Sequence, residues 1–185
     1  MLFRSLKFQN EFKMKINSFR ETDFTKLSLD KHTDSITLSA SVLAIDNSAL
    51  SQCINLKLIS VDSDNSQLAS IEGVLFTKNF ETLLCFPARY HLDHYTIPAS
   101  VTSITDSAFF NCSKLQSLVI PASVTSIGDK AFFTCRNLRS IEVDCKNLHY
   151  SSKEGILFTK TFETILCFPS KHHLTDYTIP TSVTS

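Results

Sequence analysis

Internal repetition organises this chain at two nested periods. The string Ile-Pro-Ala-Ser-Val-Thr-Ser-Ile stands at 97–104 and again at 120–127, about 23 residues later. A larger period of about 82 residues relates 61–103 to 143–185, where roughly 27 of 43 aligned positions are identical without a gap. One short unit has too little apolar surface to bury alone, so the units are expected to stack on one another as a solenoid.

The short unit covers 95–117 and 118–140, with a worn copy at 36–58. Its apolar alternation ends at Pro121, which cannot donate a ladder hydrogen bond, so a short strand is expected to stop there. A second extended piece should follow, with Val124 and Ile127 pointing inward, and then a tight helical turn beginning at Ala131.

A longer unit of about 36 residues alternates with the short one, at 59–94 and 141–176. It contains two apolar runs, 73–77 and 82–86, on either side of the polar turn 78–81. Apolar runs around a short polar turn predict a β-hairpin. The second long unit repeats this pattern.

Composition excludes several classes of protein. The chain has 185 residues, 43% of them hydrophobic, and its 18 basic side chains balance 18 acidic ones. These values are typical of a globular domain and not of a disordered chain, and there is no basic excess to bind nucleic acid. No apolar run reaches the roughly 18 residues of a membrane-spanning helix, and charged residues interrupt any signal-peptide pattern at the start.

The pattern Ile-Pro-x-Ser-Val-Thr-Ser-Ile-Gly-x-x-Ala-Phe-x-x-Cys-x-x-Leu at 120–138 resembles the BspA-like leucine-rich repeat family, and 154–169 is similar to that family's hairpin-bearing repeat. The resemblance covers about residues 34–185. It implies a curved, right-handed, β-rich leucine-rich repeat solenoid of the α/β horseshoe class. It also implies a surface adhesin or antigen that binds a protein of a host or neighbouring cell, without catalytic residues or a cofactor.

The two ends of the chain depart from the clear repeats. Residues 1–33 either form a cap, because Phe8, Phe12, Ile16 and Phe19 recur at helical spacing, or are a decayed repeat. At the other end, 177–185 begins a short unit and breaks off inside it, which predicts an uncapped strand edge. Such an edge favours end-to-end self-association, cover by a partner, or a fragment of a longer repeat protein.

The six cysteines occupy repeat positions. Cys53, Cys112 and Cys135 share one slot of the short unit, and Cys85 and Cys167 share one slot of the hairpin, so they are expected to be buried as small apolar side chains. Cys112 and Cys135 should lie about 5 Å apart at the backbone, which leaves a disulfide open. No ligand spacing predicts a metal site: the histidines near 91 and 173 have no matching carboxylate, and the calcium-loop-like start at Asp62 lacks its closing Glu.

Partner binding is therefore the function that the sequence favours. No catalytic motif is present, so an enzyme is not expected. The expected outward strand residues are Thr37, Ser60, Thr96, Val119, Glu142 and Thr178, and the expected hairpin-tip contacts are Lys78, Asn79, Glu81, Lys160, Thr161 and Glu163. Three hypotheses follow: a surface adhesin, an intracellular scaffold favoured by the unpaired thiols and the missing signal, and a non-functional fragment.

Overall fold

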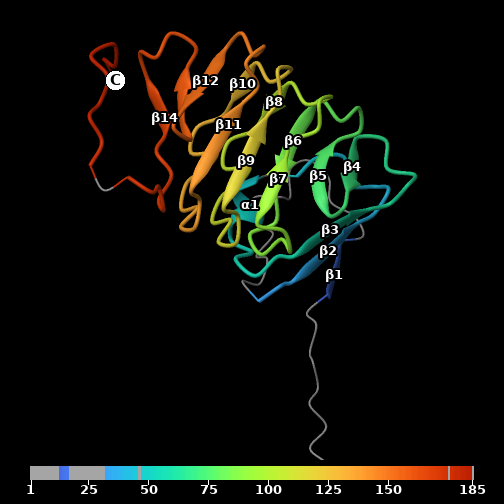
Figure 1. The fold of residues 1–185 in the computed structure, drawn as a ribbon. Coiled ribbons are helices and arrows are strands. Elements are labelled where there is room, and N and C mark those ends of the chain that lie inside the picture. Colours follow the sequence, from blue (N-terminus) through green and yellow to red (C-terminus); the bar gives the residue numbers. More distant parts are fainter. Residues whose placement is uncertain (1–12, 17–31, 46, 175, 185) are drawn as a thin grey trace, which may run out of the picture.

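The computed structural model describes residues 13–16, 32–45, 47–174 and 176–184, which form a β-solenoid whose coils follow one another from the blue to the red end of the chain (Figure 1). Its strands are β1 (Lys13–Ile16), β2 (Ser35–Leu38), β3 (Leu58–Val61), β4 (Leu68–Ile71), β5 (Val74–Thr77), β6 (Thr82–Cys85), β7 (His94–Thr96), β8 (Ser103–Ile104), β9 (Ser117–Ile120), β10 (Ser126–Ile127), β11 (Ser140–Val143), β12 (Tyr150–Lys153), β13 (Ile156–Thr159) and β14 (Ile165–Cys167). A five-residue helix, α1 (Asn47–Ser51), lies in the first complete coil.

Parallel ladders join equivalent strands of successive coils. Strands β1, β2 and β3 form one sheet, and β7, β9 and β11 form another. In the second sheet each paired residue lies opposite the residue 23 positions later in the sequence. A second side of the coils carries β6, β8 and β10, also in parallel. The expected strand end is confirmed, because β9 stops at Ile120, immediately before Pro121.

Each long unit adds an antiparallel meander. The predicted hairpin is confirmed as β5 with β6 and as β13 with β14, but each has a third strand, β4 or β12, that the sequence analysis missed. A glycine with positive φ precedes the middle strand, Gly73 at 90° and Gly155 at 79°. The positive φ of Gly73 is a backbone conformation that other residues rarely adopt, so this turn favours glycine.

The helical spacing at the start of the chain gives a wrong prediction where it can be checked. Residues 13–16 form β1, with Met14 opposite Ile36 and Ile16 opposite Leu38. Alternation of lysine and apolar residues over these four positions suits a strand, and pairing with β2 outweighs the helical pattern. The remainder of the predicted cap lies outside the described residues.

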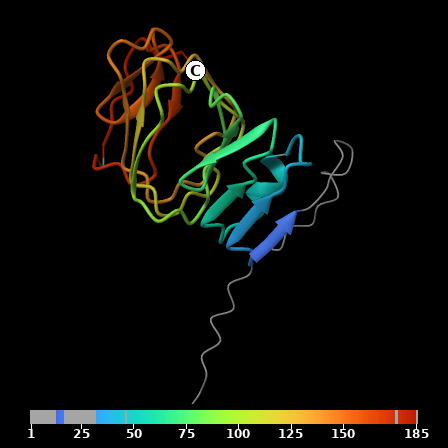
Figure 2. The same cartoon turned by 90° about the vertical axis from the view of Figure 1, so that its right-hand side faces the viewer.

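The core fills the interior of the coils, and the later coils, from green to red, overlay as loops in Figure 2. Equivalent phenylalanines stack in line: the ring centroids of Phe86 and Phe109 are 5.0 Å apart, and those of Phe109 and Phe132 are 5.5 Å apart. Offset aromatic pairs of this kind contribute about 0.5–1.5 kcal/mol beyond the area that they bury. The stacking therefore fixes the register between coils.

One buried asparagine holds each long unit to the coil before it, Asn65 in the first unit and Asn147 in the second. Asn65 and Asn147 are 1% and 0% exposed. The Asn147 amide nitrogen donates to the carbonyl oxygens of Pro121 and Val124, at 2.9 Å each, and its oxygen accepts from the backbone N–H groups of His149 and Tyr150, at 2.8 Å each. Asn65 makes the equivalent four bonds. The hydrogen-bonding capacity of each side chain is therefore fully used in the interior.

The turn expected to be helical near Ala131 is not a helix. Lys130 and Thr134 have φ values of 55° and 61°, and Ser107 and Asn111 take the same conformation one coil earlier. Left-handed residues interrupt a right-handed helix, so the segment forms successive tight turns instead. Non-glycine residues thus occupy left-handed positions, which is consistent with a chain that has only three glycines.

Candidate partner-binding surfaces

The predicted outward row is divided between two sheets. Thr37 and Ser60 are cross-strand neighbours in the first sheet, and Thr96, Val119 and Glu142 are consecutive neighbours in the second. The side chains are exposed, apart from half-buried Ser60, and Val119 is 37% exposed although it is apolar. Thr178 is exposed but belongs to no strand.

The row is divided because the turn between β4 and β5 packs beside β3. The backbone N–H of Ile59 in β3 donates to the carbonyl of Gly73 at 3.0 Å, so the neighbour of β3 is the turn between β4 and β5 and not β7. The second long unit repeats the contact between Ile141 and Gly155 at 2.8 Å. Six residues expected in one row therefore form a pair, a triplet and a separate threonine.

The predicted hairpin-tip residues are exposed and ordered by local hydrogen bonds. In the first tip the amide of Asn79 donates to Glu81 Oε2 at 2.6 Å, and Lys78 Nζ donates to the carbonyl of Ser63 at 3.0 Å. In the second tip Thr161 Oγ1 donates to Glu163 Oε2 at 2.8 Å, with Lys160 exposed beside it.

The coil that follows each hairpin tip donates hydrogen bonds to the backbone of that tip. Ser100 Oγ donates to the carbonyl of Phe80, and Ser182 Oγ makes the equivalent bond to Phe162. Thr102 N and Thr184 N donate to the carbonyls of Glu81 and Glu163, at 2.8 Å each. The two tips, 82 residues apart in the sequence, are therefore held by equivalent hydrogen bonds.

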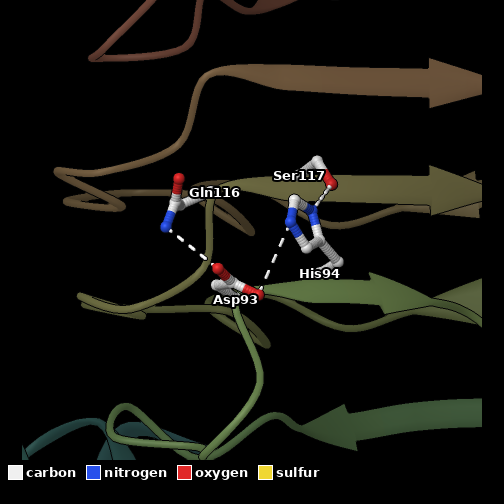
Figure 3. A network of polar contacts seen from close by, with 4 residues as sticks. All are labelled: Asp93, His94, Gln116 and Ser117. Atoms are coloured by element: carbon white, nitrogen blue, oxygen red, sulfur yellow. Dashed lines mark hydrogen bonds and ion pairs between the residues drawn. The ribbon is translucent and has the colours of Figure 1, made fainter.

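A polar network at the edge of the second sheet was not anticipated. His94 Nδ1 lies 2.5 Å from Ser117 Oγ, and His94 Nε2 lies 3.5 Å from Asp93 Oδ1 (Figure 3). Gln116 Nε2 donates to Asp93 Oδ2 at 3.1 Å, so the network joins two successive coils. The 23-residue spacing between 94 and 117 was the available signal, because parallel register places such residues side by side.

Four of the cysteines expected to be buried are buried: Cys53, Cys85, Cys112 and Cys135. Cys167 is partly buried, Cys145 is exposed, and none of the six forms a disulfide. The thiols of the shared slot donate to carbonyls one coil back, Cys135 to Phe109 at 3.0 Å and Cys112 to Phe86 at 3.6 Å. Burial raises the pKa of Cys85 to about 12 and that of Cys112 well above its usual value, so these thiols stay protonated.

The histidines and the acidic turn have structural partners. His172 Nε2 lies 2.6 Å from the carbonyl oxygen of Glu154, and His91 packs on the ring of Tyr90. The acidic turn at Asp62 leads into the buried Asn65. Within the described ranges, no group of three or more His, Cys, Asp or Glu side chains could hold a metal ion.

These features define a repeat protein of the leucine-rich solenoid class, built to present strand faces and turns. Six copies of the BspA type leucine rich repeat region match the chain, over residues 3–87 and 83–185. The chain belongs to the BspA-type leucine-rich repeat family.

Solved structures agree with this assignment. The pneumococcal vaccine antigen PcpA is 26% identical with a TM-score of 0.55, and the match covers 59% of this chain and 27% of PcpA. A leucine-rich cell surface protein from Faecalibacterium prausnitzii is 25% identical with a TM-score of 0.51, covering 68% of this chain and 35% of that protein. A leucine-rich repeat protein from Eubacterium ventriosum is likewise 25% identical with a TM-score of 0.51, covering 62% and 37%.

The matches thus span 27% to 37% of the length of these proteins. No curated protein matches it. None of the helices in the described parts has the length and apolar character needed to cross a bilayer.

Proposed function

We propose that this chain is a non-enzymatic module that binds a protein on a host or neighbouring cell, as an adhesin or surface antigen does. The observation that carries the proposal is the triplet Thr96, Val119 and Glu142, which three paired strands present outward with Val119 37% exposed. Successive coils repeat this face at a fixed spacing, and solenoid proteins use such extended repeated surfaces to bind partners.

The Asp93, His94 and Ser117 network lacks the buried geometry of a catalytic triad. In a serine hydrolase the aspartate is buried and hydrogen-bonded to the histidine, which raises the strength of that interaction. Here the side chains of Asp93 and His94 are 51% and 69% exposed, so solvent screens the pair. The contacts instead tie two coils together at the edge of the proposed binding face.

The relatives support a location at the cell surface, because one is a vaccine antigen and another is a cell surface protein. The test is antibody labelling of intact and permeabilised cells of the source organism, with a cytosolic protein as control. Labelling of intact cells is expected. Labelling only after permeabilisation contradicts the surface proposal.

Binding itself is tested with the purified chain on candidate host or neighbouring cells. The variant Val119→Arg places a charge at the centre of the triplet, and Leu148→Arg serves as the matched control because Leu148 is 79% exposed elsewhere. Loss of cell binding in the first variant only is expected. Equal binding by both variants contradicts the use of this face.

An intracellular scaffold is the second candidate, and the absence of disulfides among the cysteines favours it. None of the six cysteines forms a disulfide, including the exposed Cys145, and reduced cysteines are typical of cytosolic proteins. The labelling experiment separates the two candidates, because a scaffold is labelled only in permeabilised cells.

End-to-end self-association is a further proposal for the partner of the C-terminal coil. Leu166, Phe168 and Ile179 are 41%, 43% and 58% exposed at that end. Analytical ultracentrifugation of the purified chain and of Phe168→Lys tests it. A concentration-dependent dimer that the substitution abolishes is expected, and a monomer at all concentrations contradicts it.

A further inference from the structure

Exposed cations outnumber carboxylates in one set of turns of the solenoid. Six exposed cations lie in the five consecutive turns that precede the sheet strands and the C-terminal segment, at 52–57, 87–93, 111–116, 134–139 and 169–174. In these turns Asp93 is the single carboxylate. We call this set the basic ridge: Lys57, Arg89, Lys114, Arg136, Arg139 and Lys171.

Backbone hydrogen bonds place these turns side by side along one edge. Arg89 N donates to the carbonyl of Leu56 at 2.7 Å, and Ser113 N donates to that of Ala88 at 3.1 Å. Arg139 N donates to the carbonyl of Gln116, and Lys171 N to that of Leu138, at 2.8 Å each. Neighbouring parallel strands are about 5 Å apart, so each coil adds a cation at about that interval.

In the first half of the ridge the cations share a cavity with a carboxylate. Lys57 and Arg89 line an open cavity of about 270 Å³ together with His32, Asn55 and Asp34. Lys57 Nζ lies 3.4 Å from Asp34 Oδ2, which neutralises part of the positive charge there.

The second half carries the same layout with the neutral Gln116 at the position of Asp34, and Gln116 in turn donates to the carboxylate of Asp93. The 82-residue offset places Gln116 where Asp34 stands and Lys114 where His32 stands, beside Asn137, Arg139 and Lys171. We call these five residues the donor cluster. Within the described residues, no carboxylate lies within ion-pair distance of Arg139 or Lys171.

Two of the amides in the donor cluster are fixed by their own contacts. Asn137 Nδ2 donates to the carbonyl of Ser113 at 2.6 Å, and Gln116 Nε2 donates to Asp93 (Figure 3). Each amide nitrogen carries a second hydrogen that these bonds leave available. The donor cluster thus offers both charged and neutral hydrogen-bond donors to one ligand.

The surroundings of the ridge select among anionic ligands. Nucleic acid is disfavoured because the 18 basic side chains of the chain are balanced by 18 acidic ones, which leaves no net positive charge to attract a phosphate backbone. In the turns of the donor cluster, Leu115 and Leu138 are 1% exposed, so the apolar anchor of an acidic peptide finds little surface there; the exposed Ile54 and Leu92 lie in the turns of the first half of the ridge. A linear polysaccharide carries anionic groups separated by hydroxyls, and it needs no apolar anchor.

We propose that the basic ridge binds a linear sulfated or carboxylated polysaccharide across the donor cluster. Sulfate or carboxylate groups accept charge-assisted hydrogen bonds from Arg139 and Lys171, and sugar hydroxyls accept from Gln116 and Asn137. The ridge uses none of the outward triplet or hairpin-tip residues. The proposal therefore stands or fails independently of the proposed protein-binding function.

The experiment measures binding of the full purified chain to heparin, as the sulfated probe, at physiological salt. The ridge variant is Arg139→Gln with Lys171→Gln, and the matched control is Lys78→Gln with Lys160→Gln, which removes the same charge from the exposed hairpin tips. The ridge variant is expected to bind about tenfold or more weakly, since each lost charge-assisted bond is worth about 1.5 kcal/mol or more. The control is expected to bind as the unmodified chain does.

Three results would overturn the proposal. The first is no measurable binding to heparin, and the second is an equal loss in both double variants, which would assign binding to overall charge. The third is binding of polyglutamate or oligothymidylate at least as tight as that of heparin, which would assign the ridge to an acidic protein or to nucleic acid. Unfolding curves of both variants establish that they remain folded.

Discussion

The carboxamide nitrogen of Asn147 lies 2.9 Å from the carbonyl oxygen of Val124, which belongs to the preceding coil. Both residues are fully buried. Asn65 makes the equivalent bond to Val42 in the first long unit. The asparagine at this repeat position is thus a structural bridge between coils, and its stability contribution can be measured.

Substitution of Asn147 by Ala is expected to lower the free energy of unfolding by about 2–4 kcal/mol, because it leaves buried backbone groups without partners. Urea unfolding measures the change. Asn137→Ala is the matched control, since the Asn137 side chain is exposed and donates one described bond. A loss for Asn147→Ala no larger than that of the control would contradict the bridging role.

Thr134 carries strain that its counterpart does not. Its φ of 61° is unfavourable for a β-branched residue, whereas Asn111 occupies the equivalent position one coil earlier, and asparagine tolerates this conformation. Thr134→Asn is therefore expected to raise the free energy of unfolding by about 1 kcal/mol. Thermal unfolding tests the change beside Thr125→Asn, made at an exposed position, and no gain over that control would count against strain.

Stability should fall in alkaline solution because of Cys85. Burial raises the pKa of its thiol from 9.0 to about 12 in the folded chain. Between these two values the unfolded chain has lost the proton and the folded chain has not, so stability is intact below pH 9 and is lost as pH rises toward 12. Cys85→Ala should flatten the decline in unfolding free energy, measured by urea titration from pH 8 to 10.5. An unchanged slope would refute this origin.

The C-terminal coil should gain stability from one further coil. In the first half of the chain, the segment 104–117 covers Phe86, which is 2% exposed, whereas its counterpart Phe168 is 43% exposed. A chain extended after Ser185 by a copy of 104–117 is expected to unfold at higher temperature and to bind less of a hydrophobic dye. The control extension replaces the phenylalanine equivalent to Phe109 with Asp. Equal behaviour of the two extensions would contradict the stacking argument.

Repeat arithmetic made the solenoid, the strand end before Pro121, the hairpins and four buried cysteines predictable from the sequence. It missed β4 and β12, because segments such as 68–71 contain half-buried Ala and Ser and show weak alternation. The repeat pattern also predicted a single row of outward residues. The contact between Ile59 and Gly73, which divides that row, depends on how the meander packs and has no signal in the repeat pattern. The pair of His94 with Ser117 follows from parallel register, which becomes exact only once the strands are placed.

The parallel ladders have a mechanical consequence. Their hydrogen bonds run from coil to coil, along the direction in which the solenoid grows, so tension applied to its two ends loads one boundary between coils at a time. A chain pulled in this way peels open stepwise at low force instead of resisting as a single sheared sheet. Attached between two moving surfaces, it would lengthen gradually and absorb the pull before its outermost contacts fail.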